Sequence, residues 1–340
     1  MDILLKKPNF TNYTNLIVAG DLHWSGRNPR SRTDNYAESL TKKIDEIFML
    51  AEKHEAKGII IPGDIFDSTG LSLSTIIELI IILRSSPVRI YTIAGNHDLY
   101  EGNPLSTDRT PYGILFVNDI IHDLDEEPAE IGDKIYIMGR SFDCSITDKD
   151  IRYYIPAEKA ATIMVTHGML LEKSPGYELQ HTLLSDVANH PDAPPVLING
   201  HEHNGFRLTK INDTLFINPG SIGRIKASEE NINRIPQVTL LTICDDGEIE
   251  AKMIPLRSAK PGHEVLSREH IEEEKRRQEL TKEFLGLLAE EGKSKHLSLS
   301  DIIRDIADRD KIPLTVTREA LKRLEEAKEV LDHEQRTGTG

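Results

Sequence analysis

Short apolar runs bounded by turn residues alternate with longer amphipathic segments in the first third of the chain. The runs Leu16 to Ala19, Gly58 to Ile61 and Arg89 to Ala94 have the length and composition of buried strands. Tyr36 to His54 places apolar residues at three- or four-residue steps, which predicts an amphipathic helix, and Thr75 to Leu83 predicts a second, more apolar one. This alternation predicts right-handed crossovers within a mainly parallel sheet that helices cover.

The pattern changes in the second half, where apolar runs follow one another with no helix between them. Turn residues at Asn212-Asp213 and Asp246-Gly247 join consecutive runs and predict a second, more antiparallel layer. The expected fold is therefore α/β, a β-sandwich flanked by helices. The strands expected here are Ile135 to Met138, Thr162 to Thr166, Val196 to Asn199, Phe206 to Ile211, Leu215 to Ile217, Val238 to Cys244 and Glu248 to Ile254.

Beyond residue 257 the composition shifts to charged segments of helical period. We expect residues 1–257 to form one domain and residues 258–340 a helical C-terminal region. Only Leu314 to Val316 resembles a strand there. The helices expected are Ser267 to Glu291, one capped by Ser298 and ending at Ala307, and one capped by Thr317 and ending at Leu331.

The charge balance narrows the classes of partner. Among 340 residues, 56 Asp and Glu exceed 41 Lys and Arg, and the formal charge of −15 argues against a polyanionic partner. With only Cys144 and Cys244, neither a disulfide framework nor a cysteine zinc site is expected. The chain shows no signal peptide and no apolar run long enough for a membrane span, so we expect a soluble cytoplasmic protein without a membrane partner.

Five segments place metal-type ligands just beyond predicted strands, at the edge where ligands bind in α/β sheets. A single such motif could be a capped turn, and His167 alone could be a core histidine, but five in order argue against chance. Imidazole, carboxylate and amide oxygen suit Mn²⁺, Fe²⁺ or Zn²⁺, and two such ions about 3.5–4 Å apart serve phosphoester hydrolysis. The segments are Gly20-Asp21-Leu22-His23, Gly63-Asp64-Ile65-Phe66-Asp67, Gly95-Asn96-His97-Asp98, Thr166-His167-Gly168 and Gly200-His201-Glu202-His203.

Residues 16 to 222, which contain these segments, resemble the calcineurin-like metallophosphoesterase superfamily. The resemblance implies two divalent metal ions, Mn²⁺ first, with Fe²⁺, Zn²⁺ or Mg²⁺ as alternatives. It implies that His97 protonates the leaving oxygen and that Asp98 orients the His97 ring. The implied ligands are Asp21, His23 and His203 for the first metal, Asn96, His167 and His201 for the second, and Asp64 as the bridge.

Further details resemble the branch of DNA double-strand-break nucleases called Mre11 and SbcD. They are the run from Gly63 to Asp67, Asn218-Pro-Gly-Ser221 followed by Arg224, and the ending Ile254-Pro-Leu256. This resemblance implies a two-metal DNA exonuclease, or an endonuclease, in DNA end processing, repair or recombination. The helical tail departs from the capping domain that this branch usually carries, although compact viral relatives have chains of similar size.

Several alternatives stay open at this stage. A phosphoesterase for a small nucleotide, a phosphoprotein or another ester would use the same centre, whereas a metal-poor scaffold would lack ligands that this chain has. The C-terminal helices could form an accessory bundle, dock a Rad50/SbcC-type ATPase, or read DNA as a helix-turn-helix, and the early helices could form a homodimer.

The loop after the first ligands offers three cations. Arg27, Arg30 and Arg32 could contact DNA phosphates or lie in a solvated turn, and we favour phosphate contact. Trp24 could stack on a base or cover the strand edge.

Overall fold

The computed structural model describes residues 13–132, 135–144, 153–154, 163–269, 272, 276 and 299–324. The chain divides into two compact units, Met1–Arg268 and Glu269–Gly340. The boundary predicted after residue 257 falls inside the first unit, because the segment that follows it packs there. Val265 and Leu266 are buried, and Leu266 forms a β-bridge with Arg32.

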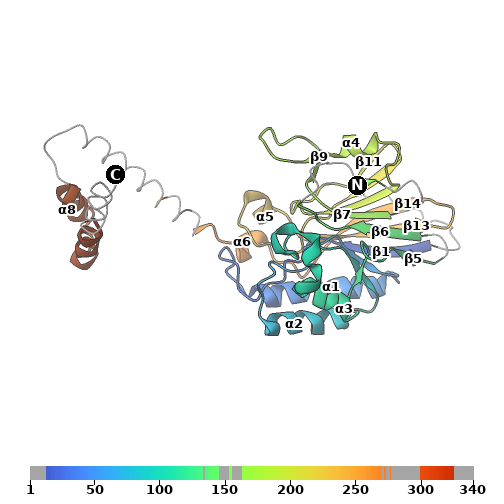
Figure 1. Cartoon of the computed structure of the whole chain (residues 1–340), viewed down its shortest axis with the longest axis horizontal. Helices are drawn as coiled ribbons and strands as arrows, with labels where there is room; N and C mark the ends of the chain where they lie inside the picture. Colours follow the sequence, from blue (N-terminus) through green and yellow to red (C-terminus); the bar gives the residue numbers. More distant parts are fainter. Residues whose placement is uncertain are drawn as a thin grey trace, which may run out of the picture. The chain divides into compact units, whose positions relative to one another are not determined.

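Two six-stranded sheets and a two-stranded ribbon build the first unit (Figure 1). The first sheet has the order β14-β13-β1-β2-β3-β4 and the second β11-β12-β10-β7-β6-β5. The first contains β1 (Tyr13–Ala19), β2 (Ile59–Ile61), β3 (Ile90–Thr92), β4 (His122–Asp123), β13 (Gln237–Cys244) and β14 (Ile249–Pro255). The second contains β5 (Ala129–Ile131), β6 (Ile135–Arg140), β7 (Ile163–His167), β10 (Val196–Gly200), β11 (Thr209–Ile211) and β12 (Thr214–Ile217). The ribbon pairs β8 (Leu170–Leu171) with β9 (Thr182–Leu183).

Helices cover the outer face of the first sheet and part of the second. Asn35 caps α1 by accepting from the Glu38 amide, and Ser72 caps α2 in the same way from Thr75, as polar residues do at helix starts. The helices are α1 (Tyr36–Lys53), α2 (Leu73–Arg84), α3 (Pro111–Val117), α4 (Leu184–Ala188), α5 (Glu229–Asn233) and α6 (Gly262–Val265). Two short 3₁₀ segments, η1 (Tyr100–Gly102) and η2 (Pro104–Arg109), precede α3.

The period of two along β1 decides which side chains enter which core. Ile17 and Ala19 pack with the helices α1 and α2, whereas Leu16 and Val18 pack between the two sheets against strands such as β7 and β10. A third cluster packs α4 on the outer face of the second sheet. The central strands of the first sheet, such as β1 and β2, are thus buried on both faces, so they are continuous apolar runs rather than alternating ones.

The structure confirms the α/β sandwich flanked by helices, and every strand predicted before residue 257 is present. The predicted antiparallel second layer is only partly right. Strands β6, β7, β10 and β12 are parallel, and only β5 and β11 at its edges run antiparallel. The hairpin β13-β14 returns to the first sheet, where β13 pairs with β1.

In the second unit, the longest described stretch is residues 299–324. Helix α8 (Leu299–Arg309) matches the prediction, and residues 314–324 form a further helix. The strand considered at Leu314 to Val316 is therefore wrong, and Thr317 does not start a helix. Its hydroxyl donates to the Pro313 carbonyl one turn earlier. Ser298 and most of the helix predicted from Ser267 to Glu291 lie outside the described residues.

Candidate metal centre

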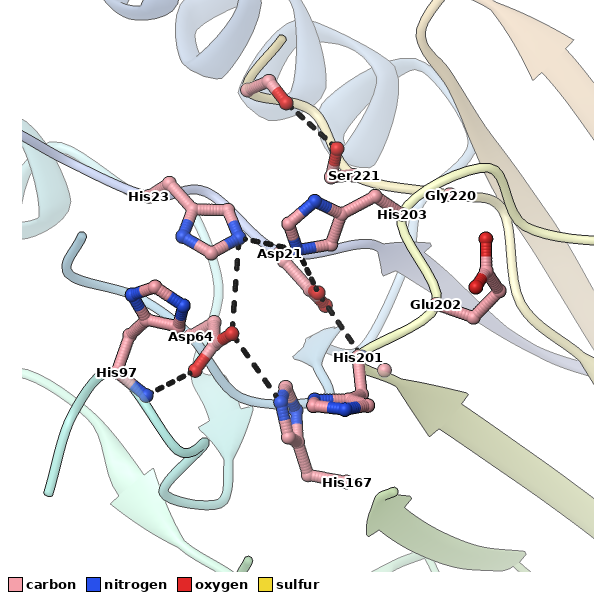
Figure 2. Close-up of polar contacts among 12 residues, drawn as sticks. Asp21, His23, Asp64, His97, His167, His201, Glu202, His203, Gly220 and Ser221 are labelled. Atoms are coloured by element: carbon pink, nitrogen blue, oxygen red, sulfur yellow. Dashed lines mark hydrogen bonds and ion pairs between the residues drawn. The ribbon is translucent and has the colours of Figure 1, made fainter. Parts of the chain in front are cut away.

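The carboxyl ends of five strands bring the ligand-type residues of the sequence motifs to one place (Figure 2). Asp21 and His23 follow β1, Asp64 follows β2, and Asn96 and His97 follow β3. From the second sheet, His167 ends β7, while His201 and His203 follow β10. Because β1, β2 and β3 run parallel, as do β7 and β10, their ends meet at the same edge of each sheet.

The side chains form two clusters that share Asp64. Ligand-type atoms of Asp21, His23, Asp64 and His203 lie within 4.8 Å of one another, and so do those of Asp64, His167 and His201. These are the members that the sequence assigned to a first and a second metal ion. Asn96 joins the second cluster, because its Oδ1 lies 2.8 Å from His201 Nδ1 and 3.1 Å from His167 Nε2.

In the first cluster, ring nitrogens and carboxylate oxygens face one another at close range. His23 Nε2 and His203 Nε2 are 2.9 Å apart, and Asp64 Oδ2 lies 3.7 Å from His23 Nε2. The buried atoms Asp64 Oδ2 and His23 Nδ1 have no hydrogen-bond partner among the described residues. Ring nitrogens and carboxylate oxygens that converge in this way are a donor set that divalent transition metals accept.

In the second cluster, a backbone carbonyl fixes the orientation of the His167 ring. His167 Nδ1 lies 2.6 Å from the Pro62 carbonyl, which can only accept, so this nitrogen carries the proton. The other ring nitrogen, His167 Nε2, therefore faces Asp64 Oδ2 at 3.3 Å. A backbone carbonyl behind a histidine in this way is a common support for metal ligands. Since Asp64 Oδ1 already accepts from the His97 amide at 2.8 Å, Oδ2 is the atom that faces both clusters.

The electrostatics of the buried side chains also favour cations. Burial, with His23 adding to it, lowers the pKa of His203 to about 2, so its ring is neutral and able to ligate. Burial acts to lower the pKa of His167, but the Asp64 carboxylate outweighs this and the pKa rises to about 9. Burial raises the pKa of Asp21 to about 6. The centre thus favours positive charge between its carboxylates, and the residues fit two divalent ions.

Backbone geometry at the ligands is unusual and is supported by glycine. His23, Asp64 and His201 have backbone φ angles of 52°, 48° and 75°, in a region that residues other than glycine seldom adopt. A Cβ at Gly95 would collide with the amide nitrogen and carboxylate of Asp64. The glycine in the motif is therefore needed for close approach of two ligand loops.

His97 lies beside the first cluster, with its ring 4.9 Å from that of His23. Its Nδ1 donates to the Asp67 carbonyl at 2.7 Å, which leaves Nε2 available to exchange a proton with a substrate. The orienting role assigned to Asp98 is therefore wrong. The buried Asp98 carboxylate instead accepts from the amides of Ile65, Phe66 and Gly95 and joins two ligand loops. The sequence had marked Asp67, but only as the end of a motif.

The three arginines of the first loop differ in position. Arg27 and Arg30 are exposed, whereas the Arg32 side chain is buried and pairs with Asp34, with Nη2 2.7 Å from Oδ1. Its guanidinium is occupied inside the fold, so the phosphate contact predicted for Arg32 is wrong. Trp24 is buried and donates to the Thr75 carbonyl at 3.0 Å, so it covers the strand edge rather than stacking on a base.

Arg32 belongs to a group that we call the basic cluster, formed by Arg32, Lys43, Arg224 and Arg234. Lys43 donates to the Ile222 carbonyl at 2.6 Å, and Arg234 donates to the Ser221 carbonyl at 2.7 Å. Arg224 donates to the carbonyls of Arg234 and Lys260. The cluster therefore holds the loop Asn218-Pro-Gly-Ser221, whose Ser221 amide donates to the His203 carbonyl.

Paired clusters of nitrogen and oxygen ligands that share a carboxylate are typical of dinuclear metal hydrolases, many of which act on phosphoesters. A family model described as calcineurin-like phosphoesterase matches residues 14–213, which include both clusters. The chain belongs to this family and is a metal-dependent phosphoesterase.

Several solved structures are similar to this chain at low sequence identity. A dimetal phosphatase from Danio rerio is 11% identical, with a TM-score of 0.44, and the match covers 72% of this chain and 99% of that one. Calcineurin-like phosphoesterase YfkN from Bacillus subtilis is 12% identical, with a TM-score of 0.45 over 72% of this chain and 91% of its own. An archaeal phosphodiesterase is 16% identical, with a TM-score of 0.36 over 71% and 100%. Comparison with curated protein sequences gives no match. Within the described residues, no helix has the length and hydropathy to cross a bilayer.

Proposed function

We propose that the protein hydrolyses DNA phosphodiester bonds with two divalent metal ions, Mn²⁺ first among them, as an exonuclease or endonuclease in DNA end processing. The observation that carries the proposal is the placement of His97 beside the paired clusters. A sugar oxygen is a poor leaving group and requires a proton as the P–O bond breaks. His97, held through Nδ1 at the Asp67 carbonyl, offers Nε2 for that proton.

The chain's own residues have separable tasks in this reaction. Asp21, His23, Asp64, Asn96, His167, His201 and His203 hold the cations. Bound divalent ions would activate water and stabilise the charge that develops at phosphorus. Asp98 and Pro62 set the positions of the ligand loops and of His167, and His97 protonates the leaving oxygen.

The substrate class rests on the motifs that resemble the Mre11 and SbcD branch. Two of these motifs border the metal centre. In the run from Gly63 to Asp67, the Asp67 carbonyl holds the His97 ring. In the loop that begins at Asn218, the Asn218 side chain donates to the Glu202 carbonyl, between the ligands His201 and His203. The overall charge of −15 does not oppose a DNA substrate locally. Two divalent cations bring more positive charge than the two ligand carboxylates, Asp21 and Asp64, remove.

Substrate class is tested with the purified full chain and Mn²⁺. Linear duplex DNA, single-stranded DNA and bis(4-nitrophenyl) phosphate are compared, with Glu202→Gln as the matched control. Glu202 lies between two ligands, but its carboxylate points away from the cluster and accepts from the Asn204 amide (Figure 2). We expect all three substrates to be cut. Cleavage of bis(4-nitrophenyl) phosphate without DNA cleavage would refute the DNA assignment and favour the alternative, a phosphoesterase for a small nucleotide or another ester.

We also propose a homodimer through α2. Its inner side, with Ile76 and Leu79, is buried, yet Leu73, Ile77 and Ile81 on another side are 72%, 53% and 65% exposed. A helix that is apolar on both sides is expected to be covered on both. Analytical ultracentrifugation should show a dimer that Ile77→Glu converts to a monomer, whereas Glu78→Lys on the same helix leaves it dimeric. A wild-type monomer at micromolar concentration would refute the interface.

The helices of the second unit are proposed to dock a Rad50/SbcC-type ATPase. Between α8 and the helix 314–324 lies an apolar groove of about 410 Å³, lined by residues such as Ile303, Ile306 and Val316. Apolar grooves of this kind accept an amphipathic helix. Ile306→Asp should abolish co-purification with the co-expressed ATPase while cleavage of bis(4-nitrophenyl) phosphate continues, and Asp308→Asn serves as the surface control. Unchanged co-purification of Ile306→Asp would exclude this groove.

A further inference from the structure

A cavity of about 250 Å³ adjoins the second cluster, and the hydrolytic roles described above do not use it. Asn96 and His201, both assigned to the second metal ion, form part of its wall. The rest of the wall includes Phe142, Met169, Leu179 and His181. A group that occupies this cavity therefore lies next to a phosphate held at the metal centre.

The aromatic part of the wall is held in place. The Phe142 ring is nearly parallel to that of His201, with centroids 5.9 Å apart and an interplanar angle of 25°. The Phe142 amide donates to the Ala94 carbonyl at 2.9 Å, and a Cβ at Gly102 would lie only 2.5 Å from the ring. The ring thus has a defined orientation beside a ligand of the centre.

The remaining wall combines apolar surface with hydrogen-bonding groups. Met169 and Leu179 supply apolar contact, and His181 Nδ1 donates to the Leu179 carbonyl at 2.6 Å, so Nε2 is its acceptor atom. Mostly apolar walls with a few polar groups are typical of sites for flat organic ligands. Phosphoserine and phosphothreonine have no flat apolar group to fill such a site, and the phosphotyrosine ring carries no polar groups along its sides, whereas a nucleobase has both an apolar face and polar edges.

We propose that this cavity is a nucleobase subsite, which receives the base of the nucleotide whose phosphate lies at the metal centre. The inference rests on the proposed function and names part of its substrate. A base and its own phosphate are separated by one sugar, which matches a cavity that shares His201 with the centre. Stacking on an aromatic ring tolerates all four bases, so the subsite holds a nucleotide without selecting sequence.

The test uses two diesters with the same leaving group, thymidine 5′-(4-nitrophenyl phosphate) and methyl 4-nitrophenyl phosphate. Only the first carries a base. We expect kcat/KM of the wild-type protein with Mn²⁺ to be about 10- to 100-fold higher for the thymidine ester. Phe142→Ala and Leu179→Ala should each lose most of this preference, because kcat/KM falls for the thymidine ester and stays unchanged for the methyl ester. Phe142→Tyr should retain the preference. Tyr13→Ala is the control, because exposed Tyr13 begins β1 at the end away from the ligands.

Equal kcat/KM of the wild-type protein for the two esters would overturn the subsite. So would an equal loss on both esters in Leu179→Ala and Phe142→Ala, since that pattern reports damage to the metal centre. Cleavage of linear duplex DNA is measured in parallel to separate this inference from the proposed function. A preference for the thymidine ester without DNA cleavage refutes the DNA assignment and keeps the subsite, whereas DNA cleavage without any preference refutes the subsite alone.

Discussion

The metal centre and the basic cluster are both buried groups of polar side chains, but they differ in whether their polar atoms have hydrogen-bond partners within the protein. In the basic cluster, donors face acceptors: Arg32 meets the Asp34 carboxylate, and Lys43 meets a backbone carbonyl. In the metal centre, buried atoms such as Asp64 Oδ2 and His23 Nδ1 have no hydrogen-bond partner among the described residues. Most donors of the basic cluster have partners within the protein, Arg224 Nε excepted, and such a group stabilises the fold, whereas buried carboxylates and imidazoles without partners form a ligand site.

Among the variants considered, Asp64→Asn should have the largest effect, because it should abolish the function of the metal centre. The amide removes the charge that both clusters share, so metal binding and hydrolysis of bis(4-nitrophenyl) phosphate should fall to background. Metal content by mass spectrometry and the hydrolysis rate are the measurements. Glu202→Gln, the same chemical change in a neighbouring loop, should alter neither. Full activity in Asp64→Asn would contradict the shared-ligand assignment.

His97→Asn should separate metal binding from proton transfer. We expect both ions to be retained while turnover of DNA falls about 10²–10⁴-fold, the usual contribution of a general acid. The loss should be smaller for bis(4-nitrophenyl) phosphate, because 4-nitrophenolate leaves without protonation. A uniform loss on both substrates would mean that His97 has another role.

Arg32→Ala should affect the fold rather than the chemistry. Removal of one partner of the buried Arg32–Asp34 pair is expected to lower the free energy of unfolding by about 3 kcal/mol, measured by urea denaturation. The kcat of the folded variant should not change. The matched variants Arg27→Ala and Arg30→Ala should keep full stability and raise KM for DNA, since these side chains are exposed. An Arg32→Ala protein of normal stability with raised KM would restore the phosphate role.

Removal of the metal ions should lower the free energy of unfolding by somewhat less than Arg32→Ala does. At a free metal concentration about 100 times Kd, chelation is expected to cost about 2.7 kcal/mol of unfolding free energy. Thermal unfolding with and without EDTA measures this shift. The Asp64→Asn protein should show none, and an equal shift in both proteins would place the bound ions elsewhere.

Lys43→Met should have the smallest effect, visible mainly in its pH dependence. Burial, with Arg32 and Arg224 nearby, lowers the pKa of Lys43 well below its ordinary value of 10.5; Arg234 adds to this and Asp34 opposes it. The unfolded chain therefore binds this proton more tightly, and wild-type stability rises with pH between the lowered folded pKa and 10.5. Urea denaturation at several pH values in that window should show a smaller slope in Lys43→Met. Identical slopes would mean that Lys43 remains charged when folded.

Local pattern was sufficient for most elements of the first unit. The period of α1 and the apolar runs of β1 and β10 record which face each element buries, and burial is the main source of their stability. Pattern failed where the partner is distant in sequence. The hairpin β13-β14 looks like part of a second sheet, yet it pairs with β1 at the start of the chain.

The same limit applies to individual side chains of the site. The sequence placed Asp98 beside His97 because they are neighbours, but the backbone turns Asp98 toward the amides of two loops and leaves the ring to the Asp67 carbonyl. The sequence suggested that Arg32 is a loop cation available to phosphate. In the fold its guanidinium donates to Asp34, Ser39 and the Arg224 carbonyl, contacts that the residue pattern does not predict.

The sequence by itself determined the type of chemistry, because the identity of a metal ligand is a property of the residue and five strand ends supply the ligand types in order. It also determined the α/β architecture, since apolar periodicity dictates which faces are buried. Only the tertiary structure decided which side chains are free for that chemistry. Whether a charged side chain meets substrate or a carbonyl depends on contacts between segments remote in sequence, as Lys43 and the Ile222 carbonyl demonstrate in the basic cluster.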